Sequence, residues 1–169
     1  MKLRHAGAED AERVARLHIA SWCATYTREL PAKFLATQDL AERTAVWRDQ
    51  IDHGVMILLA GDGVELSGFA ACGPARHAGT ETGLWEIYNL HVAPALHGQG
   101  IGSALFAAAA ALGRDRGATI LVLWVVETNA AARGFYERQG MQYEGGQLEY
   151  PVGRGQFLHE VRYLMKLMD

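Results

Sequence analysis

The segment Thr119–Val126 constrains the fold of this chain most, because every residue after Thr119 in it is apolar. A strand with one face in water alternates polar and apolar side chains, whereas a strand buried on both faces is apolar throughout. The segment therefore predicts a central strand that is covered on both sides. Helices are the usual cover for such a strand, so the chain is predicted to be an α/β domain.

Extended and helical patterns follow each other in the order β-α-α-β-β-β-α-β-α-β-β. The predicted helices span 8–23, a region from the low thirties to Asp52 that is interrupted at Pro31, 100–113 and 129–139. The predicted strands span 2–5, 55–60, 64–72, 85–92, 119–126, 141–150 and 157–167. No internal repeat or low-complexity linker separates these elements. We therefore expect one domain over residues 1–169 with a mixed sheet.

The composition argues against several classes of protein. The 16 basic and 19 acidic side chains give a net charge of −3, which disfavours sequence-independent binding of nucleic acid. No stretch approaches the roughly 18 continuous apolar residues of a membrane span, and no secretory pattern is recognisable, so a cytoplasmic protein is expected. Cys23 and Cys72 are too few for a disulfide framework. Neither they nor the seven scattered histidines show metal-ligand spacing, so no metal is expected.

Three glycines at alternate positions, Gly98, Gly100 and Gly102, lie between a predicted strand and a predicted helix. Glycine lets the backbone approach a ligand closely, and a helix N-terminus adds unpaired N–H groups and the positive end of its dipole. The segment is therefore a candidate site for a phosphate or pyrophosphate. A purely structural strand-to-helix turn is the alternative. A dinucleotide-binding fingerprint fits poorly, because Ser103 stands at its last glycine position.

Two segments resemble one known family. His97–Gly102, with the sequence His-Gly-Gln-Gly-Ile-Gly, resembles the acetyl-CoA loop of the GNAT superfamily of N-acetyltransferases, Gln/Arg-x-x-Gly-x-Gly/Ala. Asn129–Met141 is similar to the later family segment Asn-x-x-Ala-x-x-Phe-Tyr-x-x-x-Gly-Phe. The resemblance implies a mixed, mostly antiparallel twisted sheet flanked by helices, with acetyl-CoA as cosubstrate. Two positions depart from the family pattern, since His97 replaces the usual Gln or Arg and Met141 replaces the common Phe.

The resemblance also implies which residues contact acetyl-CoA. Backbone N–H groups near the end of the predicted strand 85–92 would contact the thioester and its oxyanion, namely those of Leu90, His91 and Val92. The loop and first helical turn would receive the pyrophosphate, through His97, Gly98, Gln99, Gly100, Ile101, Gly102 and Ser103. Asn129 is expected to cap a helix by its residue type, and the family adds a contact from it to the cofactor.

Acetyl transfer to an amine needs a base for the ammonium proton, a donor for the oxyanion and an acid for the departing thiolate. By resemblance, Tyr136 is the candidate acid and also contacts the cofactor. The alternative is a core tyrosine with a satisfied hydroxyl group. Arg133 and Arg138 lie on the same predicted helix and are most simply interpreted as solvated charges.

Glu86 is the candidate base and a candidate contact for the acceptor. It is the one carboxylate in the strand 85–92, which is otherwise rich in aromatic and apolar residues. Such a group either faces solvent or has a raised pKa that suits proton abstraction. Glu127 and His91 are weaker candidates for the same role. Tyr26 is a candidate wall of the acceptor pocket, whereas its i−4 neighbour Trp22 is expected in the core.

These patterns predict an enzyme that moves the acetyl group of acetyl-CoA directly to a primary amine. A small metabolite, an antibiotic-like amine and a protein N-terminus remain open as acceptors, and a homodimer is one option for its assembly. Neither cysteine lies in a motif of a nucleophile, so a covalent enzyme intermediate is not expected. The alternative function is a CoA-binding regulatory or sensor module without catalysis. No nucleic acid or membrane partner is predicted.

Overall fold

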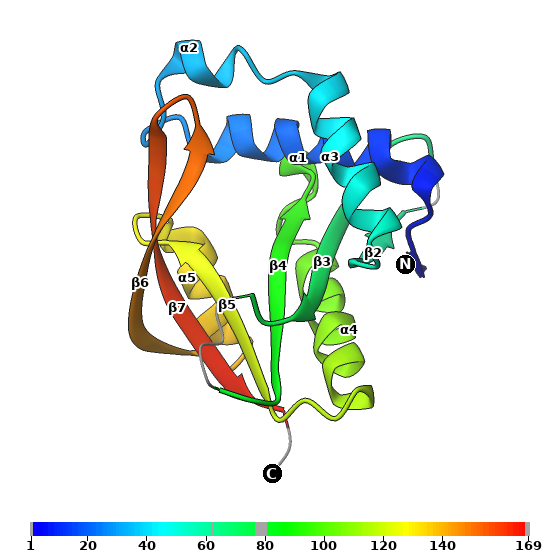
Figure 1. Cartoon of the computed structure of the whole chain (residues 1–169), viewed down its shortest axis with the longest axis vertical. Coiled ribbons are helices and arrows are strands. Elements are labelled where there is room, and N and C mark those ends of the chain that lie inside the picture. The colour runs from blue at the N-terminus through cyan, green and yellow to red at the C-terminus, as the bar shows by residue number, and fades with distance from the viewer. Residues whose placement is uncertain (1, 62, 77–80, 168–169) are drawn as a thin grey trace. The chain divides into compact units, whose positions relative to one another are not determined.

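The computed structural model describes residues 2–61, 63–76 and 81–167 (Figure 1). Its strands form one seven-stranded sheet in the order β1-β2-β3-β4-β5-β7-β6. They are β1 (Leu3–His5), β2 (Met56–Ala60), β3 (Gly68–Pro74), β4 (Leu84–Val92), β5 (Ile120–Val126), β6 (Gln142–Gly153) and β7 (Gln156–Lys166). The α-helices are α1 (Ala11–Thr25), α2 (Ala32–Leu35), α3 (Leu40–Asp52), α4 (Ile101–Asp115) and α5 (Ala130–Arg138). Short 3-10 helices, η1 (Ala8–Asp10) and η2 (Pro94–Leu96), precede α1 and follow β4.

The mixed, mostly antiparallel sheet is as predicted, and β4 and β5 form a parallel pair in it. The element order differs from the prediction at one point, since the helical region predicted from the low thirties to Asp52 is divided into α2 and α3. Backbone contacts group the chain into two compact units. Unit 1 contains the chain up to Cys72 together with Asn89–Ala109, and unit 2 contains Gly73–Tyr88 together with the chain from Ala110 onward. Within the described ranges, no helix is both long enough and apolar enough to cross a membrane.

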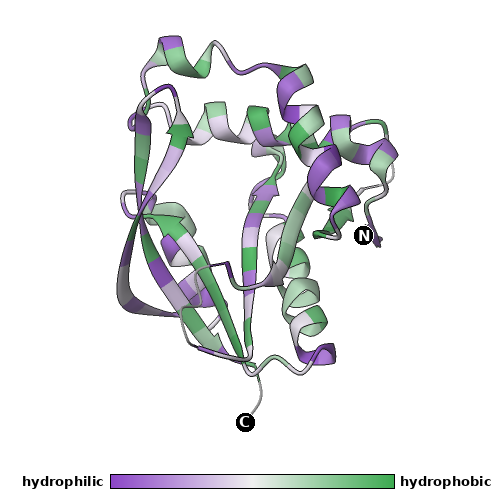
Figure 2. Ribbon diagram, in the orientation of Figure 1, coloured by the Kyte–Doolittle hydropathy of each residue, from purple (hydrophilic) through white to green (hydrophobic). Residues whose placement is uncertain are grey.

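In unit 1, α1 and α3 pack against each other and β1, β2 and β3 form antiparallel pairs. The amphipathic pattern of α1 is visible in Figure 2, and its apolar side contributes Val14 and Leu17 to the core. Trp47 of α3 and Phe69 of β3 are also buried there, with ring centroids 5.2 Å apart. Trp22 is only half-buried, which differs from the prediction that it lies in the core.

The strand that returns from β2 begins later than predicted, at Gly68 instead of residue 64. Arg13 of α1 accounts for the difference. Its guanidinium donates hydrogen bonds to the carbonyl groups of Gly63 and Val64, at 3.0 Å for the latter. These carbonyls therefore bend toward α1 and do not enter the sheet. Pairing starts only where Ser67 N–H donates to the Ala60 carbonyl at 2.9 Å.

In unit 2, β5 lies between β4 on one side and β7 on the other. It pairs in parallel with β4, from Leu84 opposite Ile120 to Ile87 opposite Leu123, and antiparallel with β7. Five of its seven residues are buried, which confirms the predicted central strand. β6 and β7 form the long hairpin in orange and red in Figure 1. The hydroxyl of Tyr163, on β7, accepts a hydrogen bond from Arg133 of α5, so the helix covers the sheet face that carries Tyr163.

Helix α4 runs beyond its predicted end at Gly113 and continues to Asp115. Gly113 is a packing position instead of a cap. A Cβ atom there would lie 2.8 Å from the ring of Trp85 and 3.1 Å from a methyl group of Leu167. Trp85 is buried and cannot move aside, so only glycine lets this part of α4 approach the strand so closely.

We predict opposite effects for two helical glycine-to-alanine substitutions. Gly113→Ala should destabilise the protein by about 1–3 kcal/mol, because the new methyl group collides with Trp85. Gly134→Ala, in α5, should stabilise it by about 0.5–1 kcal/mol, because its Cβ would meet only the end of the Arg138 side chain, at 3.4 Å. Urea unfolding of both variants and the wild type measures the difference, and equal shifts would contradict the packing role of Gly113.

Candidate active site

The glycine loop of unit 1 is open to solvent and leads directly into α4. Gly98 and Gly100 adopt left-handed φ angles of +77° and +80°. A Cβ atom built on either would have no atom within 4 Å, so the space above both backbones is free of protein atoms. Gly102 lies inside α4, one residue after its start at Ile101. The first N–H groups of α4 therefore adjoin a concave, glycine-lined backbone, which suits an anion.

His97, the departure from the family pattern, is held by the loop itself. Its Nε2–H donates to the carbonyl oxygen of Val92 at 3.1 Å. This bond ties the end of β4 to the loop and occupies one nitrogen of the ring. The ring therefore has a role in fixing the turn that is independent of any ligand.

The end of β4 in unit 1 carries a cluster of polar rings. His91 Nδ1 lies 2.9 Å from the hydroxyl oxygen of Ser21 on α1. The rings of His91 and His18 are 4.8 Å apart, and His18 Nδ1 accepts a hydrogen bond from Trp47 Nε1–H at 3.1 Å. Burial lowers the pKa of His91 to about 4. Burial first, and then the charge of His91, also lowers the pKa of His18 well below its ordinary value.

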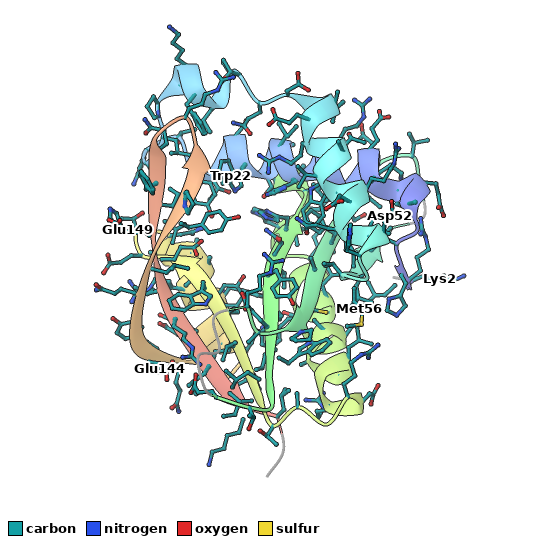
Figure 3. All side chains as sticks on the ribbon, viewed as in Figure 1. Lys2, Trp22, Asp52, Met56, Glu144 and Glu149 are labelled. Carbon is teal, nitrogen blue, oxygen red and sulfur yellow. The ribbon has the colours of Figure 1, made fainter. Side chains whose placement is uncertain are left out.

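Both rings are therefore neutral at neutral pH, and His91 is held between Ser21 and His18. Leu90 and Val92, the neighbours of His91, are the residues whose backbone N–H groups were predicted to face the thioester. The cluster fixes the strand at this point. Tyr26 follows the end of α1, and its ring packs edge-on against that of Trp22 with centroids 5.3 Å apart. Trp22 is labelled in Figure 3.

Glu86 lies in unit 2, on the part of β4 that pairs with β5. Its carboxylate is buried, with 5% of the residue exposed, and accepts a hydrogen bond from the backbone N–H of Arg76 at 2.7 Å. The alternative of a solvent-facing carboxylate is therefore wrong. Nearby, the Arg76 guanidinium stacks on the Tyr88 ring, 3.5 Å from its centroid, and the Tyr88 hydroxyl donates to the Pro74 carbonyl at 2.6 Å.

A second carboxylate of unit 2, Glu160 on β7, was missed in the sequence. Burial, and then the negative charge of Glu86, raise its pKa to about 7. It lines a pocket of about 190 Å³ together with Glu127, Gln147, Leu148, Glu149 and His159. Its only sequence signal is a carboxylate that precedes the apolar end of a strand, which a solvent-facing position would show as well.

Helix α5 of unit 2 begins as predicted. Asn129 caps it, since its Oδ1 accepts a hydrogen bond from Ala132 N–H at 3.1 Å. Of the neighbouring aromatic residues, Tyr136 is buried, with 8% exposed, and Phe135 is half-buried. Their ring centroids lie 5.2 Å apart.

The interpretation of Arg133 as a solvated charge is wrong. Its Nε–H donates to the Tyr163 hydroxyl at 3.0 Å, and another guanidinium N–H donates to the Glu127 carbonyl at 3.0 Å. Tyr163 in turn donates to Glu137 at 2.8 Å. This chain of bonds fastens α5 to β7 and to the end of β5, and so holds the helix that carries Tyr136.

The predicted site residues divide between the two units. Unit 1 holds the glycine loop, the end of β4 from Leu90 to Val92, and Tyr26. Unit 2 holds Glu86, Asn129 and Tyr136, with Glu160 added by the structure. Among the weaker candidates for the base, the neutral His91 belongs to the first group and the exposed Glu127 to the second.

Comparisons with known proteins give matches in sequence and in fold. The sequence model of the acetyltransferase (GNAT) family matches residues 12–141. The N-acetyltransferase YuaI of Bacillus subtilis is 30% identical over 127 residues, which cover 75% of this chain and 72% of that protein. A ribosomal-protein-alanine N-acetyltransferase of Brucella melitensis shares the fold, with a TM-score of 0.73, 23% identity, and coverage of 98% and 99% of the two chains. The protein yncA of Salmonella typhimurium, solved with acetyl-CoA, superimposes with a TM-score of 0.72 at 20% identity, over 100% and 95% of the chains.

The buried histidine pair predicts a pH dependence of stability. The pKa of His91 is lower in the folded protein than in the unfolded chain, so the unfolded chain binds a proton at a higher pH than the folded protein does. The free energy of unfolding therefore decreases as the pH falls from about 6.5 through about 4. Each such histidine contributes a slope of up to about 1.4 kcal/mol per pH unit in this window. Urea unfolding at pH 7 and pH 5 should show the loss for the wild type and a smaller loss for His91→Gln. Equal slopes for the two proteins would contradict a buried neutral His91.

Proposed function

The chain belongs to the acetyltransferase (GNAT) family and is an acetyl-CoA-dependent N-acetyltransferase; on this premise, we propose that it transfers the acetyl group directly to a primary amine. The observation that carries the proposal is the open glycine loop at the N-terminus of α4. The alternative of a CoA-binding module without catalysis predicts the same loop, but it gives no role to the buried Glu86.

The proposed contacts for acetyl-CoA follow from the loop. The free space above Gly98 and Gly100 admits a pyrophosphate next to the backbone, where a side chain would exclude it. The N–H groups from His97 to Ser103, among them those of Gln99, Ile101 and Gly102, would donate to its oxygens, and the dipole of α4 favours its charge. The backbone of Leu90–Val92 would contact the acetyl group and the oxyanion. Asn129 and Tyr136 complete the proposed contacts.

Glu86 would serve as the base in the transfer. The amine reacts through its nitrogen lone pair, so the ammonium form must first lose a proton. A carboxylate shielded from water is a stronger proton acceptor than an exposed one, and Glu86 is almost completely buried. Its hydrogen bond from Arg76 N–H holds the side chain in place. A water molecule between the carboxylate and the amine would serve the same purpose.

Tyr136 would serve as the acid. Attack of the nitrogen on the thioester carbon forms a C–N bond, and the C–S bond then breaks with its electron pair on sulfur. The Tyr136 hydroxyl donates its proton to this sulfur and recovers one from the nitrogen as the amide forms. A covalent route is disfavoured, because Cys72 is buried in β3 and the Cys23 sulfur lies against the Leu35 carbonyl at 3.7 Å.

The loop assignment predicts a loss of cofactor affinity in Gly100→Val. A side chain there would fill the space that the pyrophosphate needs, and we expect acetyl-CoA affinity to fall at least tenfold, or about 1.4 kcal/mol. Gly117→Val is a matched control, since Gly117 has a φ of +77° and is equally open. Both variants carry the same backbone strain. Isothermal titration should show the loss for Gly100→Val alone, and unchanged affinity would refute the assignment.

Tyr136→Phe should lower kcat more than it raises KM for acetyl-CoA, because it removes a proton donor but retains the ring. General acid catalysis typically contributes about 10²–10⁴-fold. Tyr150→Phe, on the exposed surface of β6, is the control and should leave kcat unchanged. Release of free thiol across a panel of amines measures both rates. If the kcat of Tyr136→Phe equals that of the wild type, Tyr136 is not the acid and its role is structural.

A further inference from the structure

Glu86 and Glu160 lie on the same face of the sheet in unit 2. Residues directly opposite each other in neighbouring strands share a face, and so do residues two apart in one strand. Glu86 is opposite Val122 of β5, and Glu160 is opposite Val126 of the same strand. Val122 and Val126 are four residues apart, so the side chains of the two glutamates project from one face.

This face is opposite to the one that α5 covers. Tyr163, which binds Arg133 of α5, is opposite Leu123, and Leu123 alternates with Val122 along β5. The face of Glu86 and Glu160 also carries Trp124, whose side chain is only partly buried. This face therefore carries two carboxylates and an aromatic ring, groups that suit a cation, and of the two carboxylates Glu160 lines the pocket.

Glu160 has no cationic partner within the described ranges. The nearest candidate on its own face of β7 is Arg162, but that side chain is engaged by Glu81 at 2.9 Å and Glu144 at 3.1 Å. Glu160 is half-buried, and a carboxylate that is partly withdrawn from water without a counter-ion is less favourable when charged. A cation brought by a ligand would remove this cost.

We propose that Glu160 is a second acidic residue of the acceptor site, which binds the acceptor as its ammonium form together with Glu86 and takes up the proton that the amine must lose. This inference rests on the proposed function and moves the role of the base, given there to Glu86, to Glu160. The Glu86 carboxylate is held in place by the hydrogen bond from Arg76 N–H and attracts the cation. Glu160 is the member of the pair that becomes protonated.

The protons balance over one turnover. The ammonium group transfers one proton to the Glu160 carboxylate, and the free amine attacks the thioester carbon. As the adduct collapses, the nitrogen loses a second proton, which replaces the one that Tyr136 has given to sulfur. Glu160 then releases its proton to water. The products are an amide, CoA as the thiol, and one proton in solution.

The charged surroundings of Glu160 support this role. Burial, and then the negative charge of Glu86 on β4, raise its pKa to about 7. The other ionisable groups that line its pocket are Glu127 after β5, Glu149 on β6 and His159 on β7. His159 and Glu149 lie 3.6 Å apart and are both well exposed, so they form a solvated pair at the rim. Glu149, labelled in Figure 3, lies along the outer strand β6.

The test compares pH profiles of kcat/KM for acetyl transfer to an alkylamine that the wild type accepts. The wild type should lose activity on the acidic side with a midpoint near 7. Glu160→Gln should lower the maximal rate at least tenfold and move this midpoint away from 7 by one pH unit or more, because the carboxyl group that titrates there is removed. Glu12→Gln, at an exposed carboxylate of α1, is the control and should leave the midpoint in place.

Two further measurements do not depend on activity. In protein with ¹³C-labelled glutamate, one carboxyl signal should titrate near pH 7, disappear in Glu160→Gln and shift to lower pH in Glu86→Gln. The Tm of Glu160→Gln should exceed that of the wild type at pH 8, since an unfavourable buried charge is removed, and match it at pH 5, where Glu160 is protonated.

An acidic midpoint that stays near 7 in Glu160→Gln would overturn the proposal, whatever the carboxyl titration shows. A wild type that releases no thiol with any amine would overturn the proposed function itself. A wild type that is active, with a midpoint unmoved by Glu160→Gln, would reject Glu160 alone and leave Glu86 as the base.

Discussion

Burial of β5 on both faces is the constraint on which unit 2 depends. An apolar strand without solvated residues must have strands at both of its edges and cover on both faces. β4 and β7 supply the edges, and α5 covers the face that carries Tyr163. The same pairing places Glu86 and Glu160 together on the other face. The position of the acidic residues is thus a consequence of how β5 is buried.

The conformation of the glycine loop depends on a local constraint, namely the backbone angles of its glycines. A chain that leaves a strand and enters a helix within a few residues needs left-handed backbone angles, and Gly98 and Gly100 provide them. His97 adds a hydrogen bond to the end of β4, which stabilises the turn from within. Its place in the loop, where the family usually has Gln or Arg, is therefore compatible with the phosphate site proposed there.

The burial and the partners of polar side chains were harder to predict from the sequence than the helices and strands. The sequence leaves open whether Glu86 faces solvent or is buried. The structure shows that it is buried on β4 and accepts a hydrogen bond from Arg76 N–H. Arg133 was expected in solvent because a helical arginine usually is, yet its partners come from β7 and from the end of β5. Glu160 carried no pattern at all. In each case the deciding contact lies 6 to 30 residues away along the chain, or depends on a neighbouring strand.

The sequence by itself determined the order of elements apart from the division between α2 and α3, and also the central strand, the glycine loop and the cap at Asn129. These features depend on period, residue type and neighbours within one turn. The tertiary structure decided which charges are buried and which glycines serve packing. Gly113 looked like a helix end until Trp85 was seen against it. Such features depend on which distant segments of the chain pack together, and a local sequence pattern does not specify the distance between those segments in the folded protein.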